Sequence, residues 1–198
     1  MSFKIKNTEI KISFTFFALI LIFISVNNFK MYFLTLIFGL IHELVHLFFI
    51  YRLSLPPKKI TFTLFGANIT RNSNTSLKSL DEFIINISAP LFNIFIGIII
   101  QLTINNKTEN TENIITINLL LGFFNLMPYY NFDGGNALRC LLLLKTDKEF
   151  TEQVLTITSI CVTVVFAILT FIVFTKYKYN FSFAVITIYF LLNLVFKK

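Results

Sequence analysis

The chain has 198 residues, of which 56% are hydrophobic and 14% charged, and its formal net charge is +7. Its mean hydropathy of +0.76 excludes an ordinary soluble domain and indicates an integral membrane protein. The excess of lysine and arginine is expected to face anionic lipid of the bilayer, with no nucleic acid as a partner. The two cysteines lie in apolar segments, and their spacing indicates neither a disulfide framework nor a cysteine zinc site.

The sequence contains six apolar segments, and most of them approach the length of about 20 residues that a helix needs to cross a hydrocarbon core. The sequence therefore predicts an all-α integral membrane protein with about six transmembrane helices. These form a single domain over residues 1–198, with no PDZ or nucleotide-sensing domain evident. The first segment is interpreted as an uncleaved helix because no cleavage site follows it. The predicted spans are 12–28, 31–51, 82–104, 114–144 (broken), 154–175 and 181–196.

The distribution of lysine and arginine predicts the orientation of these spans. Basic residues gather in the N-terminal tail, after the second span, after the fourth span and at the C-terminus. Cytoplasmic loops carry the excess of basic residues in membrane proteins. The chain is therefore expected in the cell membrane as a multi-pass protein with both termini in the cytoplasm.

A polar segment connects the second and third predicted spans. Residues 59–65 alternate polar and apolar side chains, and the sequence from Gly66 to Thr70 can turn and return. This pattern predicts a β-strand or small hairpin at the cytoplasmic face, and a connecting loop that happens to alternate is the other interpretation.

The only two histidines of the chain lie within His42-Glu43-Leu44-Val45-His46, inside the second predicted span. Residues four apart share one face of a helix, so both imidazoles can bind the same metal ion. Glu43 is turned aside from this pair, where it can act as the base toward a water on the metal. Short matches to this pattern also occur by chance. Ionisable side chains at membrane depth are costly, however, and indicate a functional site.

A catalytic zinc usually takes a third protein ligand and keeps one position for water. Asp133 is the only other acidic residue that lies inside an apolar segment away from its ends. It lies where Pro128 and Gly134 interrupt the long fourth segment, and a broken helix at membrane depth lines a buried or wet site. We therefore predict that Asp133 completes a site for one Zn²⁺ per chain. A simple helix cap before Gly134 is the alternative interpretation.

His42–His46 followed by Asn125–Gly135 resembles the signature of the site-2 protease family of intramembrane metalloproteases, and Ser88–Asn93 is similar to a third element of that family. The resemblance implies a zinc metalloendopeptidase that cleaves a membrane-tethered protein near the cytoplasmic face. It is closest to the sporulation branch. That branch implies a bacterial protein, a sigma-factor precursor as substrate, a sporulation membrane as location and an inhibitory membrane partner.

The resemblance also implies roles for residues around the metal. Substrate or oxyanion binding is expected of Asn125, Pro128 and Gly134. A helical substrate must unwind before cleavage, and the predicted hairpin is expected to hold it extended as an added strand. The candidate residues of this clamp are Phe62, Leu64, Phe65 and Gly66.

Two other classes of function compete with this interpretation. A metal-ion transporter would use the same ligands, but it would need polar residues aligned through several spans, and the sequence shows no such path. A catalytically silent relative would only bind partner proteins in the membrane. The intact set of ligands and base disfavours it.

Overall fold

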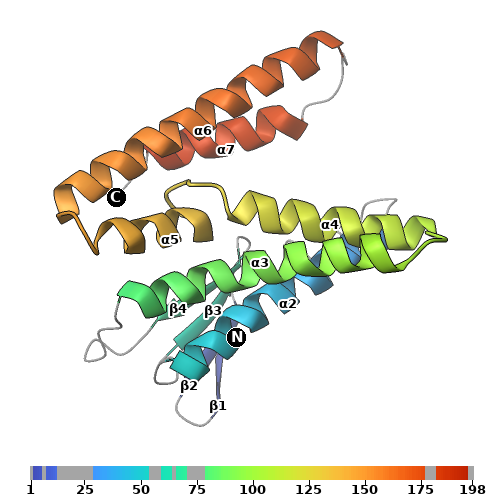
Figure 1. Ribbon diagram of the computed structural model, residues 1–198, viewed down its shortest axis with the longest axis horizontal. Coiled ribbons are helices and arrows are strands. Elements are labelled where there is room, and N and C mark those ends of the chain that lie inside the picture. The colour runs from blue at the N-terminus through green and yellow to red at the C-terminus, as the bar shows by residue number, and fades with distance from the viewer. Residues whose placement is uncertain are drawn as a thin grey trace. The chain divides into compact units, whose positions relative to one another are not determined.

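The computed structural model describes residues 2–5, 8–12, 29–53, 59–63, 66–70, 79–176 and 182–195, which are drawn in colour in Figure 1. The chain divides into two compact units, Met1–Leu126 and Met127–Lys198. The predicted first span, 12–28, lies outside the described residues except for Ile12, which ends a strand.

Within its described part, the first unit contains three helices. Their bounds are α2 (Phe29–Leu53), α3 (Ser79–Thr103) and α4 (Glu109–Asn125). α3 packs against both α2 and α4 (Figure 1). A short connection reverses the chain between α3 and α4, and the Thr108 hydroxyl caps α4 by accepting a hydrogen bond from the backbone N–H of Thr111.

Glycines allow α3 and α4 to approach each other closely. A Cβ atom added at Gly122 would lie 2.7 Å from the carbonyl oxygen of Pro90, and one added at Gly97 would lie 2.9 Å from the side chain of Leu119. Small residues at such crossings are typical of helix packing in membranes, where van der Waals contact replaces the hydrophobic effect. The crossing buries one polar side chain from each helix, Asn93 of α3 and Asn118 of α4.

The first unit also contains a four-stranded sheet. Its strands, in the order β1-β2-β3-β4, are β1 (Ser2–Ile5), β2 (Thr8–Ile12), β3 (Lys59–Thr63) and β4 (Gly66–Thr70). β3 and β4 form an antiparallel hairpin, which confirms the predicted one. β2 pairs with β3 in parallel, and Lys59 forms an ion pair with Glu9 at 3.2 Å. The prediction of an all-α protein with an N-terminal tail is therefore wrong for residues 2–5 and 8–12, which form strands.

The second unit consists of α5 (Asp133–Leu142), α6 (Lys148–Lys176) and α7 (Ser182–Val195), with α6 packed on both α5 and α7. An ion pair of 3.1 Å between Arg139 and Glu152 joins α5 to α6. Aromatic rings fill the space between the α4–α5 connection, α6 and α7, with adjacent ring centroids 4.6 to 5.7 Å apart. They belong to Tyr129, Phe132, Phe166 and Phe190.

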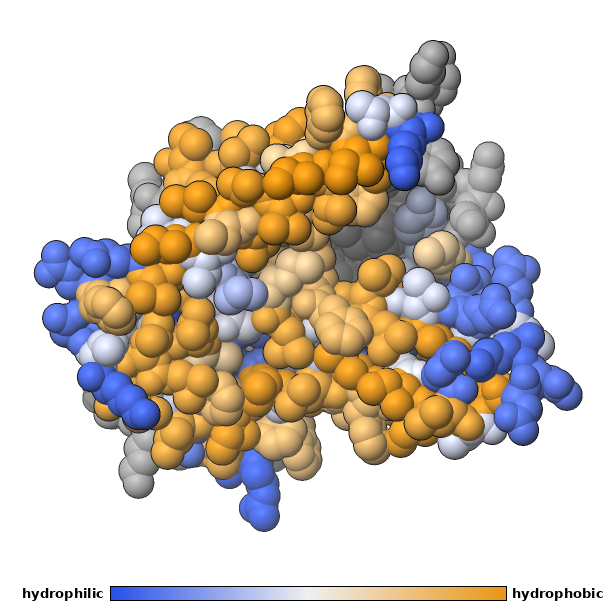
Figure 2. Space-filling view, turned by 45° about the horizontal axis from the view of Figure 1, so that its top comes forward, coloured by the Kyte–Doolittle hydropathy of each residue, from blue (hydrophilic) through white to orange (hydrophobic). Residues whose placement is uncertain are grey.

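Three of the described helices are long and apolar enough to cross a membrane: residues 30–53, 79–103 and 148–176. The predicted fourth span is broken, since α4 ends at Asn125 and α5 starts only at Asp133. Large apolar side chains are exposed along these helices, and Figure 2 shows hydrophobic residues over much of the face in view. Side chains such as Leu102 and Phe171, more than 70% exposed, have the contact with lipid that a membrane protein requires. The chain is a membrane protein.

Candidate metal centre

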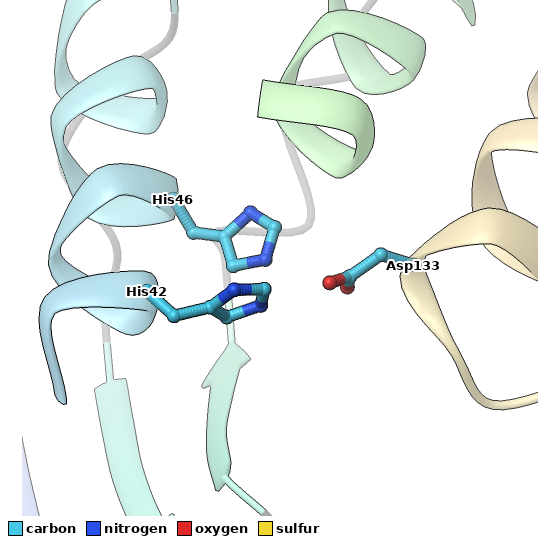
Figure 3. Close-up of side chains that lie close together, drawn as sticks. All are labelled: His42, His46 and Asp133. Atoms are coloured by element: carbon cyan, nitrogen blue, oxygen red, sulfur yellow. The ribbon is translucent and has the colours of Figure 1, made fainter. Parts of the chain in front are cut away.

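α2 places the two histidines side by side, and both are buried. His42 and His46 are 4% and 7% exposed, whereas Leu44 and Phe48 are more than half exposed to the surroundings of the helix. The two imidazole centroids lie 4.9 Å apart, with the rings nearly perpendicular. Figure 3 shows both rings projecting from the same side of α2, as the spacing of four residues predicts.

Both imidazoles are held through Nδ1 by α3. Nδ1 of His46 lies 2.9 Å from the carbonyl oxygen of Ile85, and Nδ1 of His42 lies 2.7 Å from Oδ1 of Asn93. A carbonyl oxygen can only accept, so Nδ1 of His46 carries a proton, and in the neutral ring Nε2 then has the lone pair. Ligand histidines in metal sites are oriented in this way by a bond to the other ring nitrogen.

Glu43 follows His42 directly on α2 and is half-buried. Its place on the helix separates its side chain from the face shared by His42 and His46, because successive residues of a helix lie about 100° apart. A carboxylate beside a histidine pair, and not completely enclosed, has the chemistry of a general base.

Asp133 belongs to the second unit, where it is half-buried and opens α5. The N-cap is Phe132, which makes no side-chain capping bond, so Asp133 is the first helical residue rather than the cap. A carboxylate in the first turn is favoured by the helix dipole. Asp133 is the third candidate ligand, and Figure 3 shows its side chain projecting from the start of α5.

The connection before Asp133 is held in place by specific bonds within the second unit. The hydroxyl of Tyr129 donates to the carbonyl oxygen of Phe190 at 2.7 Å, and the N–H of Tyr130 donates to Oγ of Ser159 at 3.0 Å. Gly135 packs directly on the carbonyl group of Tyr129, so a Cβ at this position would collide with the backbone. The second glycine of the motif is thus required for close approach.

The remaining predicted site residues have less specific surroundings. The amide of Asn125 donates to the carbonyl oxygen of Leu121 in its own helix at 2.9 Å, which occupies one of its donors. Pro128 is exposed in the connection, and Gly134 lies in the first turn of α5. Of the predicted clamp, the backbones of Phe62 and Gly66 lie in β3 and β4. Leu64 and Phe65 lie outside the described residues.

Sequence reasoning did not single out Asn118, which bonds to the asparagine beside His42. It is completely buried on α4, and its Oδ1 accepts a hydrogen bond from the amide of Asn93 at 2.9 Å. The available signal was an amide within the apolar part of α4, residues 114–124, four residues before Gly122. Buried polar side chains in membrane helices are commonly paired.

No family model matches the chain. A zinc metalloprotease of Methanocaldococcus jannaschii is 29% identical over 156 residues, which cover 72% of this chain and 45% of the relative. The chain thus spans less than half the length of that relative. The solved structure of a site-2 protease from the same organism matches with a TM-score of 0.65 and 20% identity, over 98% of this chain and 94% of the other. The chain has the site-2 protease fold.

Proposed function

We propose that the chain is an intramembrane zinc metalloendopeptidase. The observation that carries the proposal is the pair of buried histidines on one face of an apolar helix, each held through Nδ1 by α3, in a chain with the site-2 protease fold. The similarity to a zinc metalloprotease gives independent support.

His42, His46 and Asp133 would hold one zinc ion. They offer two imidazole nitrogens and one carboxylate oxygen, a set that fits a hydrolytic zinc site with its fourth position left to water. When bound, zinc supplies Lewis acidity for peptide hydrolysis.

Glu43 performs the proton transfers of the reaction. Its carboxylate takes a proton from the attacking water as the water oxygen bonds to the scissile carbonyl carbon. The same group then gives this proton to the leaving nitrogen as the C–N bond breaks. Asn125 is the candidate to hold the carbonyl oxygen or the substrate backbone, with Pro128 and Gly134 shaping the connection around it.

The substrate would be a membrane-tethered protein cut near the cytoplasmic face. An extended segment can add to an outer strand of the sheet by main-chain hydrogen bonds, and β4 is an outer strand of the described sheet. We further propose about six spans, both termini in the cytoplasm, and a sigma-factor precursor as the sporulation-type substrate. An inhibitory membrane partner completes this proposal. These finer assignments rest on the sequence and on its resemblance to the site-2 protease family.

Replacing Glu43 by glutamine tests the mechanism. The change keeps the size of the side chain but removes the base, so we expect cleavage to fall by about 10²- to 10⁴-fold. Zinc content should stay near that of the wild-type protein. The readout is cleavage of co-expressed single-span reporter proteins with short cytoplasmic flanks, together with comparative proteomics of host membranes.

Glu82→Gln is the matched control, because Glu82 is also half-buried but lies in the first turn of α3. It should leave cleavage unchanged. Continued cleavage by the Glu43→Gln protein would refute the mechanism, and absence of bound zinc in the wild-type protein would refute the metal site.

A further inference from the structure

We propose that Asn118 is a positioning residue for the metal site, because it fixes the tautomer of His42 through Asn93. This inference rests on the proposed zinc site. It extends that site to Asn118, whose hydrogen bonds in this network are with Asn93 and with the carbonyl oxygen of Ile114. Both asparagine side chains are completely buried between α3 and α4.

Three hydrogen bonds connect His42 to the main-chain carbonyl of Ile114 on α4. Nδ2 of Asn118 donates to the carbonyl oxygen of Ile114 at 2.9 Å. Nδ2 of Asn93 donates to Oδ1 of Asn118, also at 2.9 Å, and Oδ1 of Asn93 lies 2.7 Å from Nδ1 of His42.

The carbonyl at the end of this series sets the direction of every bond in it. A carbonyl oxygen can only accept, so Asn118 must turn its NH₂ group toward Ile114 and its oxygen toward Asn93. Asn93 must then present its NH₂ group to Asn118 and its oxygen to His42. The only arrangement with all partners satisfied makes Nδ1 of His42 the donor.

This direction decides whether His42 can bind a metal. With the proton on Nδ1, Nε2 keeps the lone pair that a metal requires. If Asn93 turned its NH₂ group to the ring instead, Nδ1 would have to accept, the proton would move to Nε2 and the ligand would be lost. His46 needs no such series, because the carbonyl of Ile85 fixes its tautomer directly.

The packing of α3 and α4 keeps this network in place. Asn93 and Asn118 are each followed four residues later by a glycine, and those glycines mark the close approach of the two helices. The amides are therefore enclosed by helix backbone on both sides of the crossing, where each must find its partner within the protein.

A purely structural role is the competing explanation, in which the two amides only join α3 to α4. Asn118→Leu alone does not separate the explanations, but a double variant does. In Asn93→Asp, both terminal atoms of the side chain are oxygens, so the carboxylate accepts from Nδ1 of His42 in either orientation. The tautomer then no longer depends on Asn118.

The experiment measures zinc affinity in detergent by competition with a chelator. We expect Asn118→Leu to weaken zinc binding by about tenfold, the lower end of the range for residues behind metal ligands, and Asn93→Leu by about 10- to 100-fold. Asn93→Asp combined with Asn118→Leu should recover most of the wild-type affinity. Recovery cannot follow from restored packing, because the double variant keeps the leucine.

Thr163→Val is the control, since it also removes a buried polar group, one whose hydroxyl donates to the carbonyl oxygen of Ser159 in its own helix. Asn118→Ala removes the same amide without added bulk and replaces Asn118→Leu if that protein does not fold. An Asn118 variant with wild-type affinity, or a double variant as weak as Asn118→Leu, would overturn the inference. A wild-type chain that binds no zinc would instead overturn the proposed function.

Discussion

At the scale of single residues, neighbouring groups determine which ring nitrogen of each histidine carries the proton and which position has no room for a side chain. The two histidines are oriented through Nδ1 by different kinds of partner. A main-chain carbonyl holds His46, and a pair of asparagines holds His42. The glycine after Gly134 has a different task, because the backbone of Tyr129 lies where a side chain at Gly135 would be.

Gly135→Ala should therefore destabilise the protein. The added methyl group meets backbone, which cannot yield as a flexible side chain does, so we expect a loss of about 1–3 kcal/mol in the free energy of unfolding. The measurement is denaturant unfolding in detergent.

Gly39→Ala on α2 is the matched control for this change. A Cβ at Gly39 meets nothing within 4 Å, so alanine should be neutral or stabilise the helix by about 0.5–1 kcal/mol. Equal stabilities of the two variants would contradict the assigned role of Gly135.

At the scale of elements, the parts of the site that lie within one helix could be predicted from sequence. His42 and His46 follow from the geometry of α2, and the β3–β4 hairpin follows from alternation and a glycine turn. Pairings between segments distant in sequence could not be predicted in this way. The parallel pairing of β2 with β3 is one example, and the amide pair of Asn93 and Asn118 is another, because neither partner's segment indicates the other.

The connection between α4 and α5 shows the same limit and leads to a prediction. The break was visible in Pro128 and the glycines, but its anchoring by Tyr129 to α7 and by Tyr130 to Ser159 of α6 was not. Tyr129→Phe keeps the ring packed on Phe190 while removing the hydroxyl, and should cost about 1 kcal/mol of stability.

Ser159→Ala removes the other anchor and should cost a similar amount, because it leaves the N–H of Tyr130 without its acceptor. Thr175→Val, at an exposed position of α6, is the control and should leave the unfolding free energy unchanged. If both anchor variants also unfolded like the wild-type protein, these bonds would not be what holds Asp133 in position.

At the scale of the whole molecule, the proposed ligands come from both compact units, with two from α2 and one from the start of α5. A ligand that binds the folded state alone stabilises it by about 2.7 kcal/mol at a concentration 100 times its Kd. Zinc should therefore raise the unfolding temperature of both units, and a chelator should lower it. If the histidines bound zinc without Asp133, only the first unit would respond.

The chain offers a direct way to follow each unit, because it contains no tryptophan. Leu102→Trp on α3 and Phe171→Trp on α6 place single probes at side chains that are 75% and 71% exposed, so neither disturbs a core. We expect zinc to shift the thermal unfolding reported by both probes. With Asp133→Ala added, the shift at Phe171→Trp should disappear and the shift at Leu102→Trp should shrink, since two imidazoles bind zinc more weakly than a complete set of three ligands. A shift at Phe171→Trp that survives Asp133→Ala would show that the second unit provides some other ligand, and the assignment of Asp133 would then be wrong.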